Sequence, residues 1–137
     1  MSALTLAQAQ AILAGALADA RAQSLKPLAV IVLDKGGHPI AFAREDGASF
    51  ARLDIARAKA AGALAMDADT SVLAERAKGN PVFFQSVSVV LDGRIAFSPG
   101  GVLVKTGGEI VGAVGISGDT GEHDDVAAKA GIAAAGF

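Results

Sequence analysis

A concentrated polar cluster follows the last apolar run of the chain. Within seven positions it holds Asp119, Thr120, Glu122, His123, Asp124 and Asp125. A histidine with a carboxylate neighbour suits general acid/base catalysis, so His123 and Asp124 are our candidate catalytic residues. The same side chains have the donor types of a His/carboxylate metal site.

The cluster also has the layout of a helix start. Asp119 stands where a cap is expected and Glu122 follows three residues later, which is the spacing of a capping box. Acidic side chains in a first helical turn also offset the helix dipole. We favour this structural interpretation over metal binding, and we predict no metal site.

The second histidine and a few basic residues are further candidates for ligand binding. His38 lies in a predicted hairpin turn, where it is either a solvated turn residue or an axial ligand to a haem iron. Arg44 and Lys59 flank the start of a predicted helix, where they either anchor a carboxylate or form surface ion pairs. The Gly100–Gly101 pair either presents backbone N–H groups to an anion or makes a bulge.

Several helices and strands must position these residues. Apolar spacing and capping residues predict helices over residues 5–23, 50–66, 70–78 and 125–134. Short apolar runs between turns predict strands over residues 28–33, 39–44, 94–97, 102–105 and 110–116. Residues 82–91 fit either type, and we expect a strand in their second half. Strands joined by tight turns predict an antiparallel sheet covered by helices, so the chain is expected to be one α+β domain over residues 1–137.

The last predicted strand carries two glycines, Gly112 and Gly115. Glycines leave a strand surface bare, so another backbone, a side chain or a flat ligand can approach it closely. We therefore expect the C-terminal hairpin and the acidic bend behind it to form one side of a pocket shared between chains.

The composition limits the classes of function. Hydrophobic residues make up 52% of the chain and aromatic residues 4%, so excess apolar surface predicts a homo-oligomer. The net charge is −2 and the twelve Lys and Arg are scattered, which argues against nucleic-acid binding. The chain has no cysteine, no apolar run of the roughly 18 residues that a membrane span needs, and no recognisable signal peptide. We expect a cytoplasmic protein that does not bind membranes.

A series of ordered motifs resembles a known family. The motifs run from Leu6 onward and include Arg44–Ala48, Ile55–Ala60, Pro99–Val102, Gly112–Gly118, Asp124–Asp125 and Ala130–Ile132. They resemble the GlcG/HbpS-like haem-binding family, which also forms the C-terminal domain of PduO-type corrinoid adenosyltransferases. The resemblance implies a profilin-like sandwich with a five-stranded antiparallel sheet flanked by helices, assembled as dimers to octamers. It also implies haem binding in some members, with haem degradation or redox sensing proposed for a subset.

The resemblance sets the expected function, an oligomeric protein that binds haem or a related tetrapyrrole. Some relatives ligate iron through an N-terminal histidine, which the first predicted helix lacks, so the ligand here would be His38, His123 or Thr120. The alternative is a cofactor-free enzyme acting on a small organic acid in a catabolic or biosynthetic pathway, and a third is an accessory subunit without a ligand. The expected cofactor-binding residues are His38, Arg44, Lys59, Gly100, Gly101, Thr120 and His123.

Overall fold

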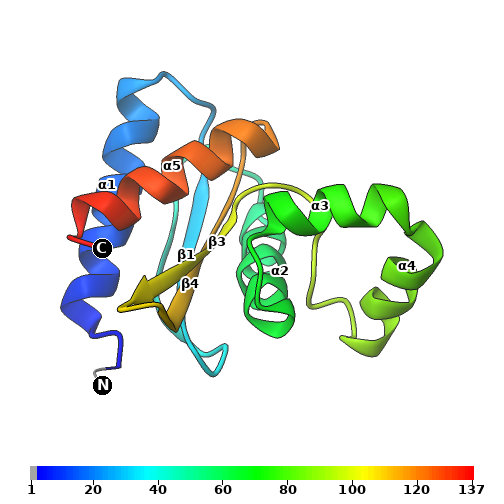
Figure 1. Ribbon diagram of the computed structural model, residues 1–137. Helices are drawn as coiled ribbons and strands as arrows, with labels where there is room; N and C mark the ends of the chain where they lie inside the picture. Colours follow the sequence, from blue (N-terminus) through cyan, green and yellow to red (C-terminus); the bar gives the residue numbers. More distant parts are fainter. Residues whose placement is uncertain (1–2) are drawn as a thin grey trace.

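A computed structural model describes residues 3–137 of the chain (Figure 1). The helices in this part are α1 (Leu6–Ala22), α2 (Ala51–Met66), α3 (Thr70–Gly79), α4 (Pro81–Val90) and α5 (Gly121–Ala134). The strands are β1 (Ala29–Asp34), β2 (Pro39–Arg44), β3 (Gly101–Thr106) and β4 (Glu109–Ser117).

The strands form one antiparallel sheet in the order β2-β1-β4-β3. The two hairpins lie side by side, because Ala29 of β1 pairs with Arg44 on one side and with Ser117 on the other. Asp34, at the far end of β1, pairs with Gly112. The β1–β2 turn and the end of β4 are therefore at opposite ends of the sheet, about 17 Å apart along the strand.

Helices cover both faces of the sheet. In Figure 1, α1 and α5 pack on one face and α2 on the other. Val30 and Val32 of β1 belong to the core beneath α1 and α5. Ile31 and Leu33 belong to the core beneath α2. A central strand that is buried on both faces needs apolar side chains at successive positions, which explains the continuous apolar run.

Local signals set several element boundaries as expected. Thr5 caps α1 in a capping box, because its hydroxyl accepts from the N–H of Gln8 and the Gln8 side chain returns to the N–H of Thr5. Gly107 and Gly108, both at positive φ, make the two-residue turn between β3 and β4.

The cap of α5 falls one residue later than predicted. Thr120, not Asp119, is the N-cap, and its hydroxyl accepts from the N–H of His123. The helix therefore begins at Gly121, four residues before the predicted start at Asp125. Thr70, the first residue of α3, does not cap the helix with its side chain, because its hydroxyl accepts from the N–H of Gly101 instead.

The prediction of a five-stranded sheet is wrong for the described residues, which contain four strands. Residues 82–91 contain no strand, because Pro81 opens the helix α4 directly after α3. Residues 94–97 also form no strand. Phe97 of this segment packs edge-on against Phe84 of α4, with ring centroids 5.4 Å apart. The antiparallel α+β class itself is confirmed.

Candidate functional site

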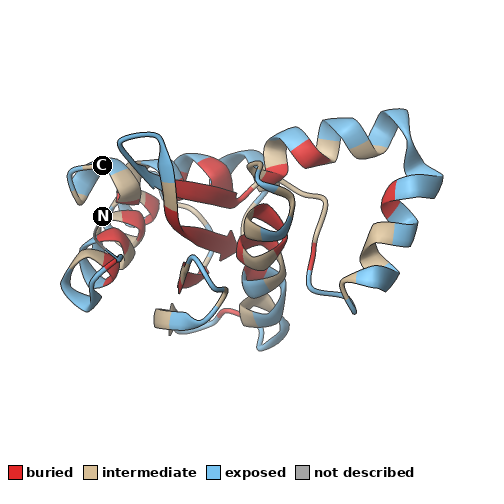
Figure 2. Cartoon of the chain, turned by 60° about the horizontal axis from the view of Figure 1, so that its bottom comes forward, coloured by how far each residue is buried: buried red, intermediate tan, exposed pale blue. Residues whose placement is uncertain are grey.

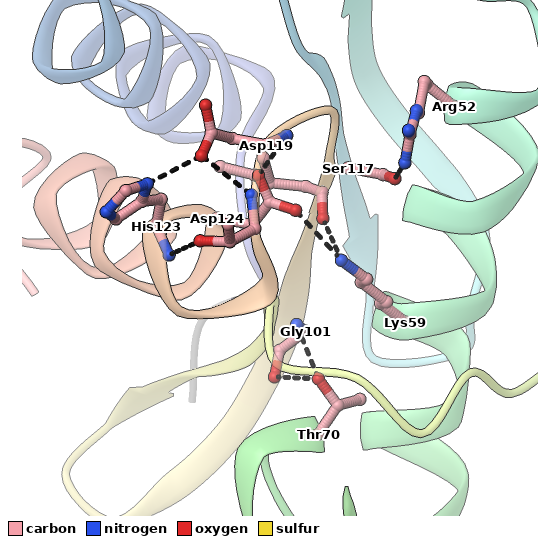
Figure 3. A network of polar contacts seen from close by, with 10 residues as sticks. Arg52, Lys59, Thr70, Gly101, Ser117, Asp119, His123 and Asp124 are labelled. Carbon is pink, nitrogen blue, oxygen red and sulfur yellow. Dashed lines mark hydrogen bonds and ion pairs between the residues drawn. The ribbon is translucent and has the colours of Figure 1, made fainter. Parts of the chain in front are cut away.

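A buried ion pair joins three elements next to the start of α5 (Figure 3). The Lys59 ammonium on α2 donates to the Ile116 carbonyl of β4 at 2.9 Å and to Asp124 Oδ2 of α5 at 3.2 Å. The two side chains are only 4% and 1% exposed. Burial raises the pKa of Asp124 and lowers the pKa of Lys59, since each charge has lost its water. The pair is almost fully shielded from solvent and links α2, β4 and α5.

Gly100 and Gly101 lie beside this ion pair and allow the neighbouring elements to pack closely. The N–H of Gly101 donates to the Thr70 hydroxyl at 2.8 Å, so this donor is already used inside the chain. A Cβ on Gly101 would collide with the Lys59 backbone, and one on Gly100 would lie 2.9 Å from Lys59 Nζ. The glycine pair therefore lets the start of β3 approach α2, and the Gly101 amide is not free for an anion.

The space beside the two glycines of β4 is also occupied by atoms of the same chain. A Cβ on Gly115 would collide with the carbonyl of Ala56 in α2, and one on Gly112 would collide with the carbonyl of Leu33. Of the three kinds of neighbour that the sequence allowed, backbone makes the close approach. The bare surface at Gly115 is a packing surface for α2, whereas Gly112 meets the backbone of β1 and the side chain of Leu4.

His123 pairs with Asp119 rather than with Asp124. The two are four residues apart, and His123 Nδ1 lies 2.6 Å from Asp119 Oδ1. The ring of His123 is 58% exposed, whereas the carboxylate of Asp119 is 11% exposed. Asp119 also accepts from the N–H groups of Lys26 and Thr120, at 2.9 and 2.8 Å. These donors, the Lys26 amide foremost, hold the pKa of Asp119 well below its usual range.

The low pKa of Asp119 predicts how the thermal stability of the protein changes at acidic pH. A carboxyl whose pKa is lower in the folded state contributes stability above its unfolded pKa, and that contribution fades as the pH falls below it. We expect Asp119→Asn to lower the Tm by a constant amount near neutral pH, and the difference from wild type to shrink below about pH 4. Thermal melts by circular dichroism across this range would measure it. The matched control is Asp67→Asn at an exposed site, and a pH-independent difference for Asp119→Asn would contradict the assignment.

His38 lies at the opposite end of the sheet, on the rim of an open cavity of about 460 Å³. We call this cavity the basic pocket. Its lining comprises Lys35, Gly36, Gly37, His38, Arg57, Ala58, Ala61, Leu64, Ala65, Leu91, Gly93 and Arg94. The β1–β2 turn, the outer face of α2 and the turn after α4 each supply one wall.

The charged side chains that line the basic pocket are all of one sign. Three cations, Lys35, Arg57 and Arg94, line it together with the His38 imidazole, and no carboxylate does. Its remaining side chains are alanines and leucines from α2 and the turn after α4. The arrangement is suited to a ligand with an apolar body and negatively charged groups.

The other predicted residues lie apart from this pocket. Arg44 donates to the Ala48 carbonyl at 2.6 Å and lines a separate open cavity with Arg21, Glu45 and Asp46. The structure thus brings together Lys59, Gly100, Gly101 and Asp124, with Thr120 and His123 beside them. It leaves His38 and Arg44 at two other places.

Two further properties concern the whole described chain. Among residues 3–137, none of the helices combines the length and apolar character needed to cross a bilayer. Within the same residues, no group of three or more His, Asp or Glu side chains gathers closely enough to hold a metal ion.

A comparison with models of known protein families shows to which family this chain belongs. The model of the haem-degrading HbpS-like protein family matches residues 4–133. The chain belongs to this family. No curated protein sequence matches it.

Several solved structures have the same fold as this chain. A double mutant of HbpS from Streptomyces reticuli is 30% identical, with a TM-score of 0.85 over 100% of this chain and 90% of that one. ORFY of Klebsiella pneumoniae is 26% identical, with a TM-score of 0.89 over 98% of this chain and 92% of that one. The PduOC:haem complex is 26% identical, with a TM-score of 0.87 over 97% of this chain and 95% of that one.

Proposed function

We propose that this protein binds haem or a related tetrapyrrole in the basic pocket, with His38 as the iron ligand. The observation that carries the proposal is the lining of this pocket, which combines an imidazole, three cations and an apolar floor without any carboxylate. Membership of the haem-degrading HbpS-like family and similarity to the PduOC:haem complex support it.

Each part of the pocket has a counterpart in the ligand. The propionates of haem are carboxylates, which Arg57 and Arg94 can bind through charge-assisted hydrogen bonds. Ala58, Ala61 and Ala65 offer small side chains against which a flat macrocycle can lie. A neutral imidazole is a common haem ligand, and the bound iron would supply redox chemistry.

The geometry of the turn that carries His38 supports this proposal. A Cβ on Gly36 would lie 3.1 Å from the His38 ring, so the glycine gives the imidazole room over the turn. The backbone N–H groups of Gly36 and His38 both donate to Asp34 Oδ1, which fixes the turn at the end of β1. The backbone that carries the imidazole is therefore held at the end of β1.

Haem titration followed by absorption spectroscopy tests the proposal. We expect the wild type to give a Soret band, His38→Ala to change its position and weaken binding, and Arg57→Ala with Arg94→Ala to weaken binding at least about tenfold. The matched control is His123→Ala, the other histidine of the chain, which should bind like wild type. Absence of a Soret band in the wild type would refute haem binding, and an unchanged spectrum of His38→Ala would refute the ligand.

The Asp119–His123 pair supports a second candidate function. An exposed imidazole held by a carboxylate of low exposure is suited to general acid/base catalysis on a small organic acid. In that case a thermal-shift screen of small acids would give a hit that the wild type turns over. His123→Ala would abolish the turnover and leave haem binding unchanged, so one variant separates the two functions.

A further inference from the structure

The segment that returns from α4 to β3 is packed against α2 at one glycine. A Cβ on Gly62 of α2 would lie 2.5 Å from Ile95 Cγ1 and 3.0 Å from Ile95 Cα. In Figure 2 this segment runs beside α2 and has one short buried stretch, and Ile95 is its buried residue, only 7% exposed. A side chain at position 62 would therefore have to move the backbone of the returning segment away from α2.

This contact joins two walls of the basic pocket. One wall comes from α2 and consists of Arg57, Ala58, Ala61, Leu64 and Ala65. Another comes from the residues just before Ile95 and consists of Leu91, Gly93 and Arg94. Neither Gly62 nor Ile95 lines the cavity itself. Gly62 thus sets how closely the wall with Arg94 approaches the wall with Arg57, although it lies outside the lining.

The guanidinium of Arg94 is held in a defined orientation. The backbone N–H of Arg94 donates to the Leu91 carbonyl at 3.1 Å, and its Nε donates to the same carbonyl at 2.9 Å. A guanidinium has five N–H donors, so the four on its two terminal nitrogens remain for a ligand. These two nitrogens form a planar fork that can bind one carboxylate through two parallel hydrogen bonds.

Both arginines of the pocket have a guanidinium to offer to a ligand. Within the part of the chain that the structure describes, neither Arg57 nor Arg94 forms an ion pair. Each can therefore bind one carboxylate. A rigid ligand with two carboxylates binds tightly only when the separation of the two guanidinium groups matches its own, because it cannot adjust its shape without a cost in free energy.

We propose that Gly62 is a positioning residue of the basic pocket, which fixes the separation of Arg57 and Arg94 so that the pocket prefers planar ligands with two carboxylates. This inference rests on the proposed function and names the class of tetrapyrrole, one with two free carboxylates rather than one whose side chains end in neutral amides or esters. Neutral ends offer no charge to either guanidinium. Lys35 adds a point charge that attracts any anion, so it makes no demand for a fixed spacing.

Fluorescence titration of the full chain with two metal-free porphyrins tests the inference. Protoporphyrin IX has two carboxylates, its dimethyl ester has none, and neither has an iron for His38 to ligate. We expect the wild type to bind the acid at least about tenfold more tightly than the ester. Gly62→Ala should bind the acid about tenfold more weakly and the ester within about twofold of wild type, because the added methyl group displaces the wall with Arg94.

The matched control is Gly79→Ala, which also lies in a helix. A Cβ on Gly79 would meet no atom within 4 Å, so this variant should keep the wild-type preference for the acid. Alanine favours a helix more than glycine does, which offsets part of the clash in Gly62→Ala, and circular dichroism would verify that the variant is folded. Ile95→Ala is a second variant that removes the contacting side chain without any clash, and it should also reduce the preference.

The outcomes separate this inference from the proposed function. Equal binding of acid and ester by the wild type would overturn the inference, and so would a loss in Gly62→Ala that affects both porphyrins alike. An unchanged preference in both Gly62→Ala and Ile95→Ala would overturn it as well. If the wild type bound neither porphyrin, a Soret band with haem would confine the failure to this inference, and the absence of that band would refute the proposed function too.

Discussion

Lys59→Met is expected to lower the free energy of unfolding by about 3–5 kcal/mol, because it leaves the Asp124 carboxylate buried without a counter-charge. The Ile116 carbonyl would lose its donor as well. Chemical denaturation monitored by circular dichroism would measure the loss. The matched control is Lys78→Met, which breaks an exposed pair with Glu75 and should leave the free energy of unfolding almost unchanged.

The loss in Lys59→Met should depend on pH in a defined direction. Burial already raises the pKa of Asp124, and removal of the ammonium raises it further. A carboxyl whose pKa is higher in the folded state favours folding when it is protonated, so the deficit should shrink as the pH falls. Replacing both partners, Lys59→Met with Asp124→Leu, should recover much of the stability. A loss no larger than that of Lys78→Met would show that the buried pair does not hold α2 to α5.

Gly115→Ala is expected to lower the free energy of unfolding by about 2–3 kcal/mol. The added methyl group would collide with the carbonyl of Ala56, so α2 must move away from β4. Two packed backbone segments cannot move apart as easily as the end of a flexible side chain can. We therefore expect the loss of stability to be large for an overpacking substitution. Thermal and denaturant unfolding would both report the loss.

Gly79→Ala is the matched control for that change. Gly79 is the last residue of α3, and a Cβ there would meet no atom within 4 Å. Alanine also lowers the entropy of the unfolded chain, so we expect unchanged stability or a gain of about 0.5 kcal/mol. If Gly115→Ala were as mild as Gly79→Ala, the close packing of α2 on β4 would not limit stability.

The basic pocket shows why sequence reasoning found only part of the candidate site. His38 was identified because histidine is rare in the chain and chemically distinctive. Arg57 and Arg94 were missed, since each looks like an ordinary surface cation until the fold brings both to the same cavity. One sequence feature could have indicated the pocket, because Arg57 lies on the Ala-rich face of the predicted second helix.

The stretch over residues 82–91 was ambiguous for a different reason. Val87, Val89 and Leu91 alternate as in a strand, while Phe83, Phe84 and Val87 fit a helix. The helix forms because Pro81 opens it and Phe84 finds Phe97 as a partner. That partner is thirteen positions away, which no local pattern can anticipate.

The sequence by itself determined the elements whose signals are local. The Thr5–Gln8 capping box, the Gly107–Gly108 turn and the continuous apolar run of β1 depend on neighbours a few residues away. Only the tertiary structure decided that Lys59 points inward to partners 57 and 65 residues later, and that His38 and His123 lie at opposite ends of the sheet. Helix capping and hydrophobic periodicity depend on residues that are close in the sequence. Burial and charge pairing depend on which distant segments the fold brings together.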